Sequence, residues 1–182
     1  MATNNKRDDT TNSQKDSNER LGKVVESLEK VTQGTKQMIF DMAKSLSELE
    51  IIQSFNQQSL DMFTIMIEIT KRMGCEDKYK VTGYKVLFDN ALKINAKLPV
   101  DKFTLIILEY AAEIYDEKED CFLTMPIPDA NVNVGNGFGI IRSEMFKNLW
   151  KQLGPTDKNL LKDNIILLTT FAHVYLYKTL LK

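Results

Sequence analysis

Residues that most catalytic and metal sites require are scarce in this sequence. Its 182 residues include one histidine and two cysteines, Cys75 and Cys121. A single histidine excludes zinc hydrolase motifs built on paired histidines, and the di-iron pattern that repeats Glu-x-x-His. Two cysteines suit neither a disulfide framework nor a zinc site, which favours a reducing compartment. We therefore predict a protein that is not an enzyme, with no catalytic residues, no bound metal and no cofactor.

An excess of charge of either sign is also missing. The chain has 24 Lys and Arg against 25 Asp and Glu, so its formal net charge is −1. No global field therefore attracts nucleic acid or an anionic membrane. The first twenty residues lack the apolar core of a signal peptide. The uncharged run from Asn164 to Tyr177 is shorter than the roughly 20 residues that cross a bilayer. We expect no nucleic-acid partner, no membrane span and an intracellular, cytoplasmic location.

What the sequence does contain is helical periodicity. Apolar residues recur at spacings of three and four from Leu21 to Met73, in one heptad frame. The pattern ends at Gly74, a usual residue for a left-handed helix cap. A single helix of this length would extend roughly 80 Å, more than its own body could cover. We therefore predict that these positions form an interaction seam with a partner helix: Leu21, Val24, Leu28, Val31, Met38, Met42, Leu49 and Ile52.

Three regions follow from this pattern. Residues 1–18 are almost entirely polar and are predicted to be a disordered tail. Residues 19–59 are predicted to form an extended, coiled-coil-like helix that begins near Asn18. A break at 33–35 is the alternative, because Gly34 costs about 1 kcal/mol in a helix relative to Ala. Residues 60–182 are predicted to form a compact helical body. The expected class is all-α.

The body is predicted to be a bundle of about five helices. The second half of the long helix is the first, and the others are expected at 83–97, 102–119, 143–153 and 157–181. Leu87 and Phe88 share the expected core face of the second of these helices. A long loop at 120–139 is rich in proline and glycine, and loops of this length are often functional or mobile.

Candidate chemical groups are few. His173 lies on an apolar helix and is interpreted as a neutral core histidine bonded to a hydroxyl or carbonyl. Cys121 is interpreted as a small buried side chain, with a thiol-dependent enzyme as the remaining alternative. Acidic residues at 116–120 end a helix and form a candidate docking patch, although a solvated helix end explains them too.

Two interpretations of function remain. The first is a non-enzymatic assembly or adaptor protein, in which the seam pairs with itself or with a partner helix inside a larger complex. The composition leans towards Asn, Lys and Ile, which hints at an AT-rich genome such as that of some viruses. The second is a monomeric bundle, broken near Gly34, with a groove that binds a partner helix or peptide.

Overall fold

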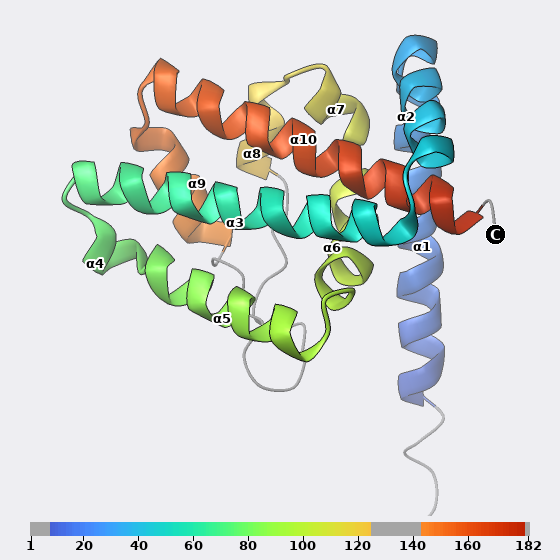
Figure 1. The fold of residues 1–182 in the computed structure, drawn as a ribbon, viewed down its shortest axis with the longest axis horizontal. Coiled ribbons are helices and arrows are strands. Elements are labelled where there is room, and N and C mark those ends of the chain that lie inside the picture. Colours follow the sequence, from blue (N-terminus) through green and yellow to red (C-terminus); the bar gives the residue numbers. More distant parts are fainter. Residues whose placement is uncertain (1–7, 125–142, 181–182) are drawn as a thin grey trace, which may run out of the picture.

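A computed structural model gives the fold and describes residues 8–124 and 143–180. These residues form ten helices and no strand, so the all-α prediction is confirmed. Two long helices, α3 (Glu48–Arg72) and α10 (Pro155–Leu180), lie side by side and run in opposite directions (Figure 1). The other helices of the body pack around this pair: α4 (Glu76–Tyr79), α5 (Val81–Ile94), α6 (Leu98–Leu108), α7 (Ala111–Tyr115), α8 (Glu119–Thr124) and α9 (Ser143–Gln152).

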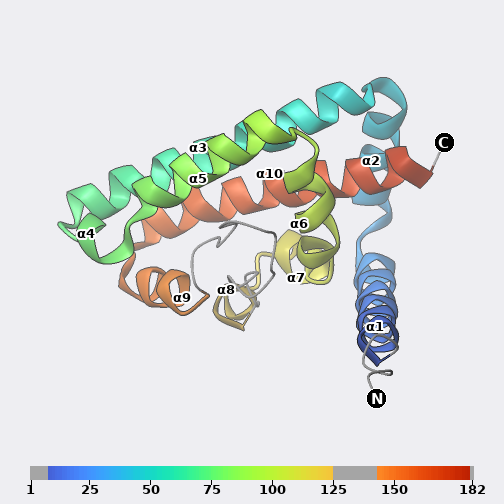
Figure 2. The same ribbon diagram turned by 90° about the horizontal axis from the view of Figure 1, so that it is seen from below.

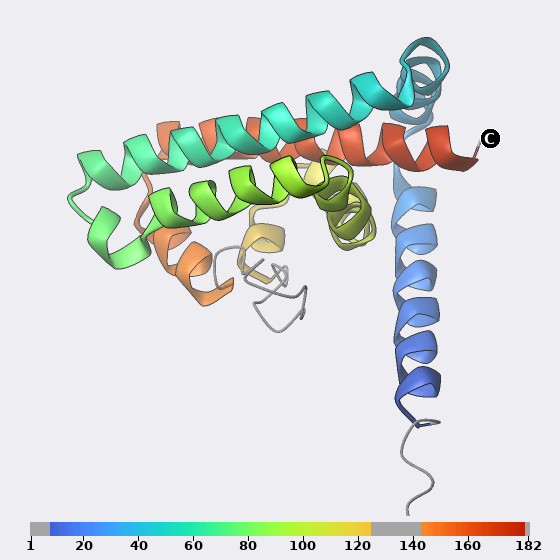
Figure 3. The same cartoon turned by 60° about the horizontal axis from the view of Figure 1, so that its bottom comes forward.

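The first two helices stand across one end of the body. They are α1 (Asp8–Lys30) and α2 (Gln33–Ser45). Figures 1 and 3 show them near the C-terminal end of α10, steeply inclined to α3 and α10. α2 packs on α10, and α1 packs on α6 and α7. Figure 2 shows the beginning of α1 pointing away from the body.

The sequence predicted one long helix or two, and the structure has three. The first break lies between Lys30 and Gln33, where the Thr32 hydroxyl caps α2 by accepting a hydrogen bond from the Thr35 amide at 3.3 Å. Gly34 lies in the first turn of α2, beside the break and without a positive φ. α1 also begins at Asp8, well before Asn18. Residues 8–18 are therefore helical, in contrast to the predicted disorder.

A second break, between α2 and α3, has a sequence signature. The Ser47 hydroxyl accepts a hydrogen bond from the Glu50 amide at 3.2 Å, and the Glu50 carboxylate accepts one from the Ser47 amide at 2.8 Å. This reciprocal pair is a capping box, written in sequence as Ser-x-x-Glu. The Ser47 amide, and the Ser47 hydroxyl, which donates to the same carboxylate at 2.8 Å, lower the pKa of the Glu50 carboxyl. The heptad frame continues through Ser47 unchanged, which explains why periodicity alone gave no break there.

Helix boundaries in the body differ from the predictions at α5, which runs from Val81 to Ile94 in place of 83–97, and in the region of α6 to α8. The helix expected at 102–119 is two helices, α6 and α7, which are separated at Glu109 and Tyr110. α6 also begins earlier, with Pro99 in its first turn, where a missing amide hydrogen costs nothing. The predicted loop at 120–139 begins inside α8, and its part beyond residue 124 lies outside the described residues.

Two hydrophobic clusters form the core, one at each end of the α3–α10 pair. The near core lies beside α1 and α2 and is rich in small side chains; it includes Val24, Val31, Ile39, Ala43, Ile51, Phe55, Val100, Ala111, Ala112, Ala172 and Val174. The far core lies beside α4, α5 and α9 and is rich in aromatic side chains; it includes Phe63, Met66, Tyr79, Phe88, Phe146, Leu149, Trp150 and Leu161.

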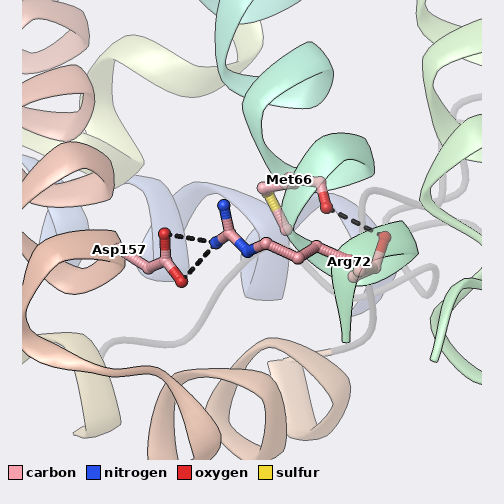
Figure 4. Close-up of polar contacts among 4 residues, drawn as sticks. Met66, Arg72 and Asp157 are labelled. Atoms are coloured by element: carbon pink, nitrogen blue, oxygen red, sulfur yellow. Dashed lines mark hydrogen bonds and ion pairs between the residues drawn. The ribbon is translucent and has the colours of Figure 1, made fainter. Parts of the chain in front are cut away.

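An ion pair ties α3 to α10 at the far end. Figure 4 shows Arg72, at the end of α3, reaching Asp157 in the first turn of α10, with Nη2 2.6 Å from both carboxylate oxygens. Each charge also suits the dipole of its own helix, since a cation favours a helix C-terminus and an anion an N-terminus. Because Arg72 is mostly exposed, the pair contributes little free energy and mainly fixes the relative position of the two helix ends.

Candidate interaction surface

The structure divides the predicted seam into an inner and an outer part. Val24, Val31 and Ile52 are buried in the near core, and Leu28 and Met42 are partly buried against it. The outer part is exposed: Leu21 by 49%, Met38 by 48% and Leu49 by 62%. Five of the eight positions therefore pack inside one chain, and three remain available to a partner.

Polar contacts hold α1 in this position. The Ser27 hydroxyl is buried and accepts a hydrogen bond from the Ala112 amide at 3.1 Å, which satisfies a donor at the start of α7. Nearby, Arg20 Nε lies 3.1 Å from the Glu109 carboxylate. The inner face of α1 is thus used by α6 and α7. A heptad frame marks an apolar face and does not say whether the chain itself or a partner covers it.

From residue 15 to the residue before Val24, α1 is exposed. Residues 15–23, which we call the arm, are all exposed, whereas Val24 is 1% exposed. The arm is rich in Asp, Asn, Ser and Lys and includes Gly22, so it has little intrinsic preference for a helix. A Glu19–Lys23 ion pair of 3.3 Å adds a few tenths of a kcal/mol at most.

An apolar patch marks the base of the arm. Leu21 and Val25 are one helical turn apart, so their side chains are neighbours on one face. Their exposed fractions are 49% and 51%. We call this pair the arm-base patch. Val25 lies outside the heptad frame and was missed for that reason. The signal available in the sequence was a second apolar residue four positions after Leu21.

A second exposed apolar face lies on α5. Val86, Leu87 and Ile94 are 52%, 44% and 85% exposed, whereas Phe88 and Ala91 on the opposite side are buried. The sequence placed Leu87 on the core face with Phe88. The structure shows that α5 is rotated so that only Phe88 of the two enters the far core. Adjacent positions on a helix point about 100° apart, so one can be buried while the other is not.

The histidine prediction agrees with the structure. His173 is 0% exposed, and its Nδ1 lies 3.3 Å from the Tyr115 hydroxyl. The Tyr177 ring lies edge-on at 4.8 Å between centroids. Burial first, and the charge of Lys36 second, lower the pKa of His173 to about 4. Within the described residues its Nε2 has no hydrogen-bond partner. The imidazole is therefore neutral at physiological pH.

Cys121 and the acidic cluster also have structural partners. Burial and the Glu113 charge raise the pKa of Cys121 to about 11, which makes its thiol a poor nucleophile at neutral pH. It lines a surface cavity of about 420 Å³ together with Tyr110 and Glu113. In the acidic cluster, Glu119 and Glu117 lie 2.6 Å and 3.9 Å from two lysines of α10, Lys158 and Lys162. The predicted docking patch is thus partly neutralised by the chain itself.

Within residues 8–124 and 143–180, no group of three or more His, Cys, Asp or Glu side chains is arranged to hold a metal ion. Over the same ranges, no helix is both long enough and apolar enough to cross a membrane.

Comparison with known proteins finds a viral relative. The chain is 58% identical over 172 residues to "Uncharacterized protein R465" of Acanthamoeba polyphaga mimivirus, an alignment that covers 94% of this chain and 96% of the relative. No family model matches the chain. No solved structure matches it either.

Proposed function

The chain belongs to the same family as this mimivirus protein, and on that premise we propose that it is a non-enzymatic assembly or adaptor protein of a virus. In this proposal it self-associates or binds a partner helix through the arm and the arm-base patch of Leu21 and Val25. The relative supports a viral source and carries no activity in its name, so the role itself depends on the surface of α1.

The observation that carries the proposal is the exposure of the arm. Residues 15–23 are exposed and have weak helix propensity. A helical segment with few tertiary contacts is only marginally stable in water. It gains stability when a second helix packs against it, and Leu21 and Val25 supply an apolar contact at its base. Because five seam positions are internal, the contact proposed is shorter than a full coiled coil.

The second interpretation, a monomeric bundle that binds a partner helix, is favoured by the burial of most seam positions inside a single chain. Val24, Val31 and Ile52 complete the near core without a second chain. In this version the arm-base patch receives a helix of a different protein, and the chain alone is a monomer. The two versions share a surface and differ in the identity of the partner.

The test uses the full chain, since removing residues up to 59 would delete much of the near core. Leu21→Lys combined with Val25→Lys places two charges on exposed positions and leaves the core intact. Leu160→Lys, 43% exposed on α10, is the matched control. Light scattering after size-exclusion chromatography measures the mass of each variant over a range of concentrations.

Self-association through the arm predicts that the double variant forms smaller species than the natural chain and the control. A shorter chain that begins at Arg20 keeps Leu21 and Val25, so any reduction of its mass relative to the natural assembly measures the contribution of the residues before Arg20. Identical masses for the natural chain and the double variant would overturn arm-mediated self-association. A natural chain whose mass does not depend on the arm, but which loses binding to a viral partner in the double variant, would identify the adaptor version.

A further inference from the structure

The exposed face of α5 follows a pattern that the proposed function does not use. Figure 1 shows α5 along one edge of the body, next to α3. Phe88 and Ala91 point into the protein, and Val86, Leu87 and Ile94 are on the solvent side. Ile94, at 85%, is the most exposed large apolar side chain in the described parts of the chain. Such exposure on three nearby residues indicates a contact surface.

The outer residues of α5 have coiled-coil spacing. Gly83, Leu87, Asn90 and Ile94 are separated by four, three and four residues, the alternation of a and d positions in a heptad. A side chain added at Gly83 would meet nothing within 4 Å. A second helix can therefore approach closely at this point of α5.

We propose that a second copy of this chain binds here, with α5 packed antiparallel against α5 of the copy about a two-fold axis at Asn90. In this arrangement a residue before Asn90 faces the residue equally far after Asn90 in the copy. Val86 then meets Ile94 of the copy, and Leu87 packs on the aliphatic stem of Lys93 of the copy. Each apolar contact occurs twice, so the face is complementary to itself, which is what a two-fold interface requires.

The charges on α5 favour a copy of the same chain over another helix. Asp89 and Lys93 lie on one flank of the helix. The antiparallel pairing brings Lys93 of each chain towards Asp89 of the other. Asp89 is held within its own chain by one long contact, 3.7 Å from Lys85 Nζ, so its carboxylate has room for a second cation. At the axis, the Asn90 amides of the two chains can hydrogen-bond to each other, and an Asn at such a position fixes the register.

The size of the contact sets the conditions for testing it. α5 has 14 residues and so is about 21 Å long. A pair of such helices buries less than the roughly 1,600 Å² of a standard interface. We therefore expect a dissociation constant in the micromolar range, on the order of 1–100 μM, and measurements should span these concentrations.

The first experiment uses Ile94→Lys in the full chain, measured by sedimentation equilibrium. Because Ile94 is exposed, the substitution leaves the fold unchanged and places a charge in the proposed contact. The dissociation constant of the α5 dimer should rise at least about tenfold, while Leu160→Lys leaves it unchanged. An Ile94→Lys protein that associates as tightly as the natural chain would overturn the proposal.

The second experiment tests the two-fold axis directly. With Cys75 changed to Ser, an Asn90→Cys substitution places two thiols across the axis, where they can form a disulfide under mild oxidation. A Lys151→Cys substitution on the exposed surface of α9 is the control. Rapid covalent dimerisation at position 90 and slow reaction at 151 support the axis. Equal rates at the two positions would overturn it.

The proposal does not depend on the arm, and the variants separate the two. If both surfaces associate, the natural chain forms species larger than a dimer, because two different two-fold contacts on one chain link copies into a series. Either set of substitutions then gives dimers, and the combination gives a monomer. If only α5 associates, the natural chain is a dimer, Ile94→Lys is a monomer and the arm variant is unchanged.

Discussion

The near core and the far core achieve the same burial with different side chains. The near core joins α1, α2, α6 and α7 to the end of α10, and its buried members include several valines and four alanines, among them Ala43, Ala111 and Ala172. The far core joins fewer long helices and is filled by Phe63, Phe88 and other rings. A small side chain has little buried volume to lose on truncation, whereas each aromatic side chain contributes a large one.

The two cores should therefore be sensitive to opposite changes in side-chain volume. Removing volume should damage the far core most, because an aromatic side chain that is lost leaves a large cavity. Adding volume should damage the near core most, because its small side chains, such as Ala172, are fully buried and an enlarged side chain must displace its neighbours. His173, a buried group that can acquire a positive charge in acid, lies on α10 between the near-core residues Ala172 and Val174, and no histidine is among the described members of the far core. The predictions below test this contrast.

The largest effect is expected from Trp150→Ala in the far core. Trp150 is 1% exposed, and its ring lies 5.9 Å from that of Phe146 between centroids. Losing this volume should lower the free energy of unfolding by about 3–5 kcal/mol. Urea denaturation followed by circular dichroism measures the loss. A cost below about 1 kcal/mol would show that the aromatic side chains do not hold the far core together.

The next effect is acid sensitivity from His173 beside the near core. Its pKa is about 4 in the folded chain against 6.5 when exposed, so the neutral form is favoured by folding. The resulting stability is fully present above pH 6.5 and is lost as the pH falls from 6.5 through 4. Its full size is about 3 kcal/mol, at 1.36 kcal/mol for each pKa unit.

The control for this effect is His173→Gln, which keeps a polar side chain of similar length and cannot titrate. Denaturation curves at several pH values between 4 and 7 should show a shallower loss of stability in the variant than in the natural chain. The carboxylates titrate in both proteins and cancel in the comparison. Parallel pH profiles would mean that His173 is accessible to protons without unfolding of the near core.

A smaller effect is expected from Ala172→Leu. Ala172 is 0% exposed on α10 and belongs to the near core. The three added carbon atoms should displace neighbouring helices and lower the free energy of unfolding by about 1–3 kcal/mol. Ala96→Leu, at an exposed position, is the control and should change stability by less than about 0.5 kcal/mol. If Ala172→Leu stabilised the protein instead, the near core would contain unfilled space.

The smallest effect is expected from Ser47→Ala at the junction of α2 and α3. The substitution removes the hydroxyl that accepts a hydrogen bond from the Glu50 amide. It should lower the free energy of unfolding by about 1 kcal/mol. Amide hydrogen exchange in the first turn of α3 should accelerate with little change elsewhere. Thr32→Ala, at the α1–α2 break, is the parallel test. Unchanged exchange at Glu50 would show that the packing of the near core, and not the cap, holds this junction.

Much of the fold could be predicted from the sequence because local signals were strong. The all-α class follows from periodicity, and Gly74 does end its helix with a positive φ of 68°. α9 and α10 were placed within two residues of their observed ends. The neutral core state of His173 followed from the apolar helix around it. Each of these inferences needs only residues near one another in the sequence.

The candidate surface was harder to predict because it depends on contacts between distant residues. Val24 and Leu21 both occupy seam positions of the heptad, so the repeat does not distinguish them. The packing of α1 on α6 and α7 buries Val24 and leaves Leu21 exposed. Leu87 was assigned to the core for the same reason. The Ser47 capping box was readable, yet a heptad frame that continued across it concealed the break.

The shared use of α3 and α10 has a consequence for how the molecule denatures. α3 contributes Ile51 and Phe55 to one cluster and Phe63 and Met66 to the other, and α10 likewise contributes to both. Because both helices contribute to both clusters, neither cluster can unfold without disrupting α3 and α10. The two ends of the protein should therefore unfold together as one cooperative unit, so that damage at Trp150 and damage at Ala172 lower the same melting temperature.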